Sequence, residues 1–194
     1  QFIKKLGISL FFSILFVALD SYLQWITGKN IFGWSTNDPY RLSSFFGDEL
    51  IVGGYLARLT PVCLALLLMS IKITKLKLFV GLLFLILIDV IVFGSGERAA
   101  FFFITLYTIL IIVLSNKYQA YRLFTFILSA IIISLITFYD PTSNEKVKDT
   151  INEVTNNITV PLAPYTPHHE EHYTVGLKMF LDNPFFGQAP KMFR

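Results

Sequence analysis

The sequence predicts an all-α fold: a polytopic bundle of transmembrane helices with a large extracytoplasmic loop that contains short helices. Two observations predict it. Of the 194 residues, 54% are hydrophobic, which is too apolar for an ordinary soluble domain. These residues also gather in five long runs, each close to the ~20 residues that a helix needs to cross a bilayer. The expected spans are about residues 6–26, 50–71, 78–94, 99–115 and 123–139.

The rest of the chain follows from these spans. Residues 1–139 form the expected transmembrane bundle, and residues 140–194 form an extracytoplasmic loop that is incomplete. The formal net charge of +3 is small and scattered, so it does not indicate a nucleic-acid partner. Cys63, the single cysteine, lies in the second span and is interpreted as an inert packed thiol. Because the chain starts at Gln1 and stops just after a glycine-rich turn, we expect a fragment cut at both ends.

The orientation of the bundle follows from its basic residues. If the five spans alternate, the lysines and arginine around them fall on one side, which the positive-inside rule makes cytoplasmic. The opposite side then receives residues 27–49, the turn at 94–98 and everything after 139. The basic residues in question are Lys4, Lys5, Lys72, Lys75, Lys77, Lys117 and Arg122.

Three ionisable residues lie inside the apolar runs: Asp20, Arg58 and Asp89. A charge at the middle of the membrane costs roughly 2.5–3.5 kcal/mol on insertion scales, so it needs a partner or a task. Counted along ideal helices, all three lie roughly 9–12 Å below the non-cytoplasmic surface. We therefore expect Arg58 within ion-pair reach of Asp20 or Asp89. Such a cluster is either a structural clip between helices or the wall of a substrate cavity, and the sequence leaves both open.

The turn at residues 94–98, Gly-Ser-Gly-Glu-Arg, joins the third and fourth spans on the same side. Ser95 is expected to cap the fourth span, and Gly96 gives the turn flexibility. Free amides at a helix start, together with Arg98, make an anion site of the kind that phosphates occupy. Arg41 lies in the preceding loop on the same side, so we expect it to join this site.

The segment after residue 139 predicts two short helices. The first, about residues 140–158, begins with a capping-box pattern from Thr142 to Glu145, and the second covers about residues 170–181. His168, His169 and His172 lie near the start of the second helix, but they do not form a zincin pattern, so no metal site is predicted. His172 is kept as a candidate substrate contact, with a general-base role conceivable.

Four segments resemble the O-antigen polymerase and O-antigen ligase superfamily, which are bacterial envelope glycosyltransferases. They occur in the family's order and on the expected side of the membrane. Two features depart from the family pattern. The family's histidine-containing segment is expected beyond residue 194, and Glu97 stands where serine or threonine is common. The resembling segments are residues 19–25, 41–61, 95–100 and 182–187.

The resemblance implies a sugar reaction at the periplasmic face of the bacterial inner membrane. The donor would be a glycan on undecaprenyl diphosphate, and the acceptor a sugar hydroxyl of a second glycolipid. Another lipid-linked glycan as acceptor would make the protein a polymerase, and lipid A-core would make it a ligase. The family is thought to need no metal or cofactor. By resemblance, Arg41 and Arg98 would hold the diphosphate, and the partners would be the two glycolipids and the surrounding membrane lipids.

Two other classes of protein are compatible with an apolar bundle. A transporter or flippase of lipid-linked glycans also needs intramembrane charges, but the sequence shows no internal repeat of the kind that transporters carry. A membrane scaffold without a site would account for the spans, but it would not account for the charged residue Arg58 inside one of them. Longer glycan chains formed from a lipid-diphosphate glycan would distinguish the enzyme from a carrier.

Overall fold

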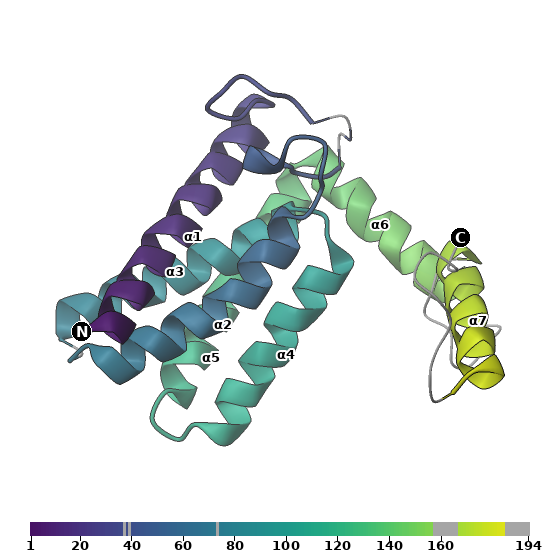
Figure 1. Cartoon of the computed structure of the whole chain (residues 1–194). Helices are drawn as coiled ribbons and strands as arrows, with labels where there is room; N and C mark the ends of the chain where they lie inside the picture. Colours follow the sequence, from purple (N-terminus) through teal and green to yellow (C-terminus); the bar gives the residue numbers. More distant parts are fainter. Residues whose placement is uncertain (37, 39, 73, 157–166, 185–194) are drawn as a thin grey trace. The chain divides into compact units, whose positions relative to one another are not determined.

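The computed structural model describes residues 1–36, 38, 40–72, 74–156 and 167–184 (Figure 1). In this part of the chain every regular element is a helix, and the β-type pairing found is an isolated bridge between Lys29 and Ser35. The chain divides into two compact units, residues 1–144 and 145–194. The helices are α1 (Phe2–Thr27), η1 (Ser44–Phe46), α2 (Val52–Ser70), α3 (Lys75–Gly94), α4 (Arg98–Leu114), α5 (Gln119–Tyr139), α6 (Pro141–Asn156) and α7 (Pro167–Asp182).

The all-helical fold is confirmed for the described residues. Four of the described helices, α1, α2, α3 and α5, are long and apolar enough to cross a bilayer. The fourth expected span corresponds to α4, which is apolar but has only 17 residues and so lies at the lower limit for a crossing. The two short helices expected after residue 139 are present as α6 and α7.

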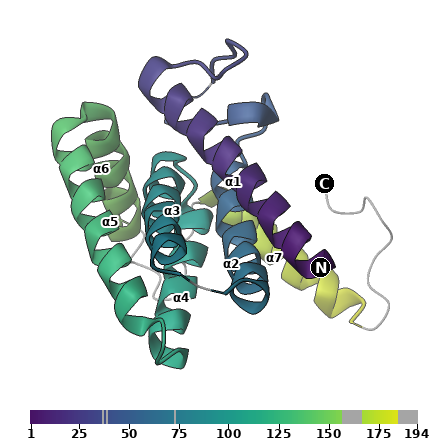
Figure 2. The same cartoon turned by 90° about the vertical axis from the view of Figure 1, so that its left-hand side faces the viewer.

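Helix α3 is the centre of the first unit. It packs against α1, α2, α4 and α5, and Figure 2 shows it between the α1–α2 pair and the α4–α5 pair. Ile88 and Ile91 of α3 are fully buried in one apolar cluster with Ile14 of α1 and Leu56 of α2. Large apolar side chains also cover the outside of the bundle, which is the pattern of a helix bundle surrounded by lipid.

The start of α6 differs from the expected capping box. The carboxylate of Asp140 accepts hydrogen bonds from the amides of Thr142 and Ser143, at 3.4 and 3.0 Å. Asp140 is therefore the residue that satisfies the free amides of the first turn, two residues before the predicted cap at Thr142. Aspartate is among the best capping residues. Pro141 follows it as the first helical residue, a position at which proline is common.

Candidate anion-binding site at the turn between α3 and α4

The turn at residues 94–98 is closed by Ser95. Its hydroxyl donates to the carbonyl of Val92 at 2.7 Å and accepts from the amide of Glu97 at 3.4 Å. The first of these bonds satisfies a carbonyl at the end of α3. The prediction that Ser95 caps α4 is therefore wrong, because the N-cap position of α4 is Glu97, which forms no side-chain cap.

Both glycines of the turn are required by close packing. A Cβ atom on Gly94 would overlap the ring of Trp25 from α1. Gly96 has a φ of 75°, and a Cβ there would meet the carbonyl oxygen of Tyr40 and lie 3.2 Å from Cγ of Arg41. The turn is thus fitted against α1 and the preceding loop, which a larger residue at either position would prevent.

Glu97 connects the turn to the start of α2. Its carboxylate accepts hydrogen bonds from the amides of Gly53 at 2.6 Å and Gly54 at 3.0 Å. These amides belong to the first turn of α2, where unpaired donors and the positive end of the helix dipole favour an anion. The sequence assigned this role to the start of α4. In the structure the start of α2 carries an anion instead, and this anion is the carboxylate of Glu97.

Arg41 lies beside the turn, as the sidedness of the sequence led us to expect. The amide of Leu42 donates to the carbonyl of Ser95 at 3.4 Å, which joins the two segments directly. The half-buried guanidinium of Arg41 donates through Nη2 to the carbonyl of Leu50 at 2.7 Å. Arg98 is exposed at the first position of α4, so the two arginines lie at the same end of the bundle.

Asp20 holds the loop that carries Arg41. Its carboxylate accepts hydrogen bonds from the amide of Ile31, at 2.8 Å, and from the hydroxyl of Ser44. Gln24, one turn further along α1, accepts from the amide of Ser44 at 2.7 Å. These bonds hold Ser44 at a φ of 48°, a conformation that residues other than glycine rarely adopt. Asp20 therefore orders a loop, and does not pair with Arg58 as predicted.

Asp89 also has a different partner from the one predicted. It forms a two-pronged ion pair with Arg122 of α5, with both nitrogen–oxygen distances at 2.8 Å. Arg122 also donates to the hydroxyl of Thr108, and Ser129 donates to Asp89 at 3.1 Å. The side chain of Arg122 is only 2% exposed. The sequence analysis placed this arginine in a cytoplasmic loop, but α5 begins three residues earlier and turns it inward.

A signal for this pair was present in the sequence. The buried residues of α5 are Arg122, Thr125 and Ser129, all polar and spaced three and four apart. Such spacing places them on one face of a helix, so that a polar stripe runs along an otherwise apolar span. A stripe of this kind predicts a charged or polar partner on a neighbouring helix, here Asp89 of α3.

Arg58 is exposed on α2. Within the part of the chain that the structure describes, no ion pair or hydrogen bond of its side chain is found. It shares the exposed face of the helix with Val62 and Met69, four and eleven residues later. The predicted cluster of Asp20, Arg58 and Asp89 is therefore wrong, because the two acids are engaged elsewhere.

His172 lies in α7, but its side chain falls outside the described residues, and its role stays a prediction. Comparison with known protein families, with curated proteins and with solved structures finds no match for this chain. The fold and site thus define a helical membrane protein with two arginines and a helix-bound carboxylate at one end of its bundle.

Proposed function

We propose that the protein is a membrane glycosyltransferase that moves a glycan from undecaprenyl diphosphate to a sugar hydroxyl. The observation that carries this proposal is the contact between the Arg41 segment and the turn that leads into Arg98. Two cationic side chains that are 57 residues apart in the sequence thereby come to one end of an apolar bundle. Anionic head groups of membrane lipids lie at such an end.

The proposed reaction requires cations close to the leaving diphosphate. The bond between the anomeric carbon and the diphosphate oxygen breaks, and the same carbon forms a bond to the acceptor oxygen. The diphosphate leaves with additional negative charge, and the acceptor proton passes to a base, which by the resemblance would be a histidine. Fixed cations in a water-poor site stabilise such a leaving group strongly. Arginine can bind phosphate oxygens through two parallel hydrogen bonds.

The structure around the arginines supports a preorganised site. Asp20 and Gln24 hold the loop before Arg41, and Glu97 fastens the turn before Arg98 to the start of α2. The segments that flank both arginines are thus held by hydrogen bonds to acidic or amide side chains. A fixed cation needs no reorganisation when charge develops, and this is the condition under which electrostatic catalysis is large.

The experiment is a transfer assay with the purified protein in liposomes. Wild-type protein should lengthen an undecaprenyl-diphosphate glycan if it is a polymerase, or load lipid A-core if it is a ligase, and both acceptors are supplied. Arg98→Ala should lower the rate by about 10²–10³-fold, by analogy with the loss of an oxyanion-binding donor. Arg98→Lys should restore part of the rate, because an ammonium cannot bind phosphate in the two-pronged geometry.

Arg41→Ala should behave like Arg98→Ala, and the double variant should lose less than the product of the two effects if both cations bind one diphosphate. Lys117→Ala, which removes a cation from the turn between α4 and α5, is the matched control and should leave the rate unchanged. Wild-type chain lengths from a folded Arg98→Ala protein would rule the mechanism out. Movement of the glycolipid across the membrane without transfer would identify a carrier instead.

A further inference from the structure

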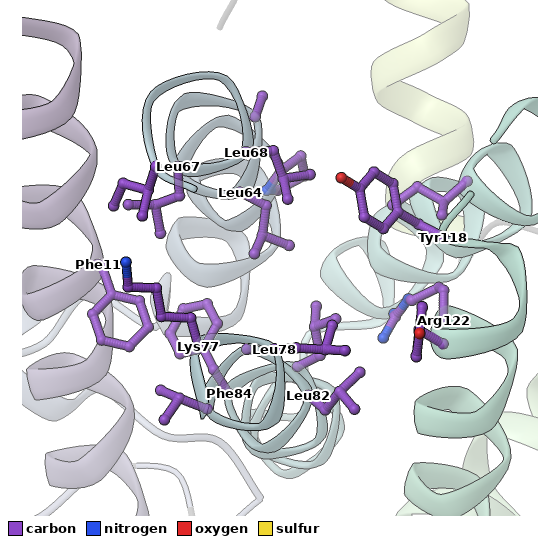
Figure 3. Close-up of a pocket in the computed structure, with 18 of the residues that line it drawn as sticks. Phe11, Leu64, Leu67, Leu68, Lys77, Leu78, Leu82, Phe84, Tyr118 and Arg122 are labelled. Atoms are coloured by element: carbon purple, nitrogen blue, oxygen red, sulfur yellow. The ribbon is translucent and has the colours of Figure 1, made fainter. Parts of the chain in front are cut away.

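The described part of the bundle contains an apolar cavity of about 620 Å³, formed by α1, α2, α3 and the region where α4 turns into α5. Figure 3 shows Leu64 and Leu68 of α2 facing Leu82 of α3 across it, with Phe11 on one side and Tyr118 on the other. Its volume lies within the range of pockets that bind small molecules. The lining is almost wholly hydrocarbon, so the cavity suits an apolar chain.

The cavity reaches the end of the bundle that is formed by the α2–α3 and α4–α5 turns. Ile71 and Lys77 line it from the first turn, and Ser115 and Tyr118 line it from the second. Lys77 lies at the far end of α3 from the turn at 94–98. The cavity is therefore separate from the site with the two arginines, and an inference about it does not depend on the proposed function.

Exposed lysines surround this end of the cavity. Lys72, Lys75 and Lys77 lie at or beside the α2–α3 turn, and the ammonium of Lys77 donates to the carbonyl of Lys72 at 3.2 Å. On the other side, the ammonium of Lys117 lies 5.1 Å from the ring centre of Tyr118, which lines the cavity. The head of any molecule in the cavity would thus be surrounded by positive charge.

Negative charge is missing from the same region of the sequence. Residues 1–19, 50–88 and 99–139 contain no aspartate or glutamate. Asp89 of α3 is paired with Arg122, a residue that lines the cavity. The lysines therefore have no carboxylate partners in these segments, and the mouth of the cavity is complementary to an anion.

We propose that this cavity binds an anionic phospholipid, with one acyl chain between α2 and α3 and the phosphate among Lys72, Lys75 and Lys77. Basic pockets between membrane helices are known to select anionic head groups. The positive-inside rule places this end of the bundle at the cytoplasmic leaflet, which carries the anionic lipids. A long apolar chain with an anionic head meets both the lining and the charge of the site.

Gly81 offers a way to fill the cavity without disturbing the helices. It lines the cavity, and a Cβ atom there would meet no other atom within 4 Å. Gly81→Phe should therefore occupy the space of the acyl chain. Ala65→Phe, from the facing helix α2, is a second filling variant in case the first fails to fold. Leu83→Phe is the matched control, because Leu83 is exposed on α3 and does not belong to the lining.

The measurement is native mass spectrometry of the detergent-solubilised protein titrated with phosphatidylglycerol or phosphatidylcholine of identical chains. Wild-type protein should retain phosphatidylglycerol on the order of 10²-fold more tightly, which corresponds to about 1 kcal/mol from each of the three lysines near the head group. Changing Lys72, Lys75 and Lys77 together to glutamine should remove that preference and leave weak binding of both lipids. Gly81→Phe or Ala65→Phe should weaken both lipids, while Leu83→Phe should weaken neither.

Three results would overturn the proposal. The first is equal retention of the two lipids by wild-type protein, which would remove the role of the lysines. The second is unchanged phosphatidylglycerol binding in a filling variant that unfolds at the wild-type temperature. The third is an equal loss of binding in Leu83→Phe, which would show that the lipid coats the outside of the helix.

Discussion

The two ends of the bundle are built in different ways. At the end with the α3–α4 turn, polar side chains from the helices bind backbone amides: Asp20 binds Ile31, and Glu97 binds Gly53 and Gly54. At the end with the α2–α3 and α4–α5 turns, the helices enclose an apolar cavity surrounded by lysines. A site that must hold charged groups in fixed positions needs loops that are ordered by hydrogen bonds. A site that only receives a flexible hydrocarbon chain needs an apolar cavity.

The largest expected effect tests the ion pair that lies between these two ends. Asp89→Leu or Arg122→Leu should each destabilise the bundle by about 3–5 kcal/mol, because either change leaves one buried charge without its partner. Denaturant unfolding in detergent measures this. The double variant should recover much of the loss, since two apolar residues need no partner.

Arg58→Leu is the matched control for that experiment. Arg58 is exposed and lacks a partner among the described residues, so its removal should leave the unfolding free energy unchanged or slightly higher. A loss as large as that of Arg122→Leu would show that Arg58 is paired after all, and it would restore the cluster expected from the sequence.

The next effect concerns the ordered end of the bundle. Glu97→Ala removes two hydrogen bonds to a charged acceptor, and such bonds contribute about 1.5–3 kcal/mol each at most. Because Glu97 is half-buried, the unfolding free energy should fall by about 1.5–3 kcal/mol in total, and the turn before Arg98 should lose its attachment to α2. Glu49→Ala, which changes an exposed acid of the same loop region, should be neutral. Equal effects of the two changes would contradict the assignment of Glu97.

A pair of glycine substitutions compares the two ends directly. Gly94→Ala places a methyl group against the ring of Trp25 and should cost about 1–3 kcal/mol, as overpacking does elsewhere. Gly81→Ala enters open space and should raise helix stability by up to about 1 kcal/mol. Thermal unfolding of the two variants checks the contrast. Changes of the same sign and size would show that the ends do not differ in packing.

The smallest perturbation tests which side of the membrane each end faces. Ser35→Cys and Asn116→Cys change exposed loop residues at opposite ends of the bundle and should not alter stability. In intact cells, an impermeant thiol reagent should label the cysteine at position 35 and leave the one at 116 unlabelled. Labelling of position 116 from outside would reverse the orientation on which both site proposals depend.

Hydropathy predicted the apolar helices, and the alternation of the spans predicted that Arg41 lies at the same end as the 94–98 turn. It works because each span must satisfy its own backbone in the membrane, which makes length and apolarity sufficient signals. The partners of the charged residues were not predicted, because pairing depends on how each helix is rotated and shifted against its neighbours. Arg122 was assigned to a loop since the apolar run begins after it, although α5 starts at Gln119.

Glu97 shows a second kind of limit. In the sequence it is a single acid next to a glycine-rich turn, and nothing nearby indicates what it binds. Its partners, the amides of Gly53 and Gly54, are more than 40 residues earlier in the chain. A contact between a side chain and a distant backbone amide leaves no periodic pattern, so only the fold reveals it.

The buried ion pair also has a consequence for biosynthesis. Asp89 precedes Arg122 by 33 residues, so at ribosomal speeds of 5–20 residues per second it is made roughly 2–7 s earlier. During that interval the acid of α3 has been synthesised and its cation has not. The first three helices therefore lack the partner of Asp89, and the hairpin of α4 and α5 supplies it. The bundle can reach its final packing only after the start of α5 has been made.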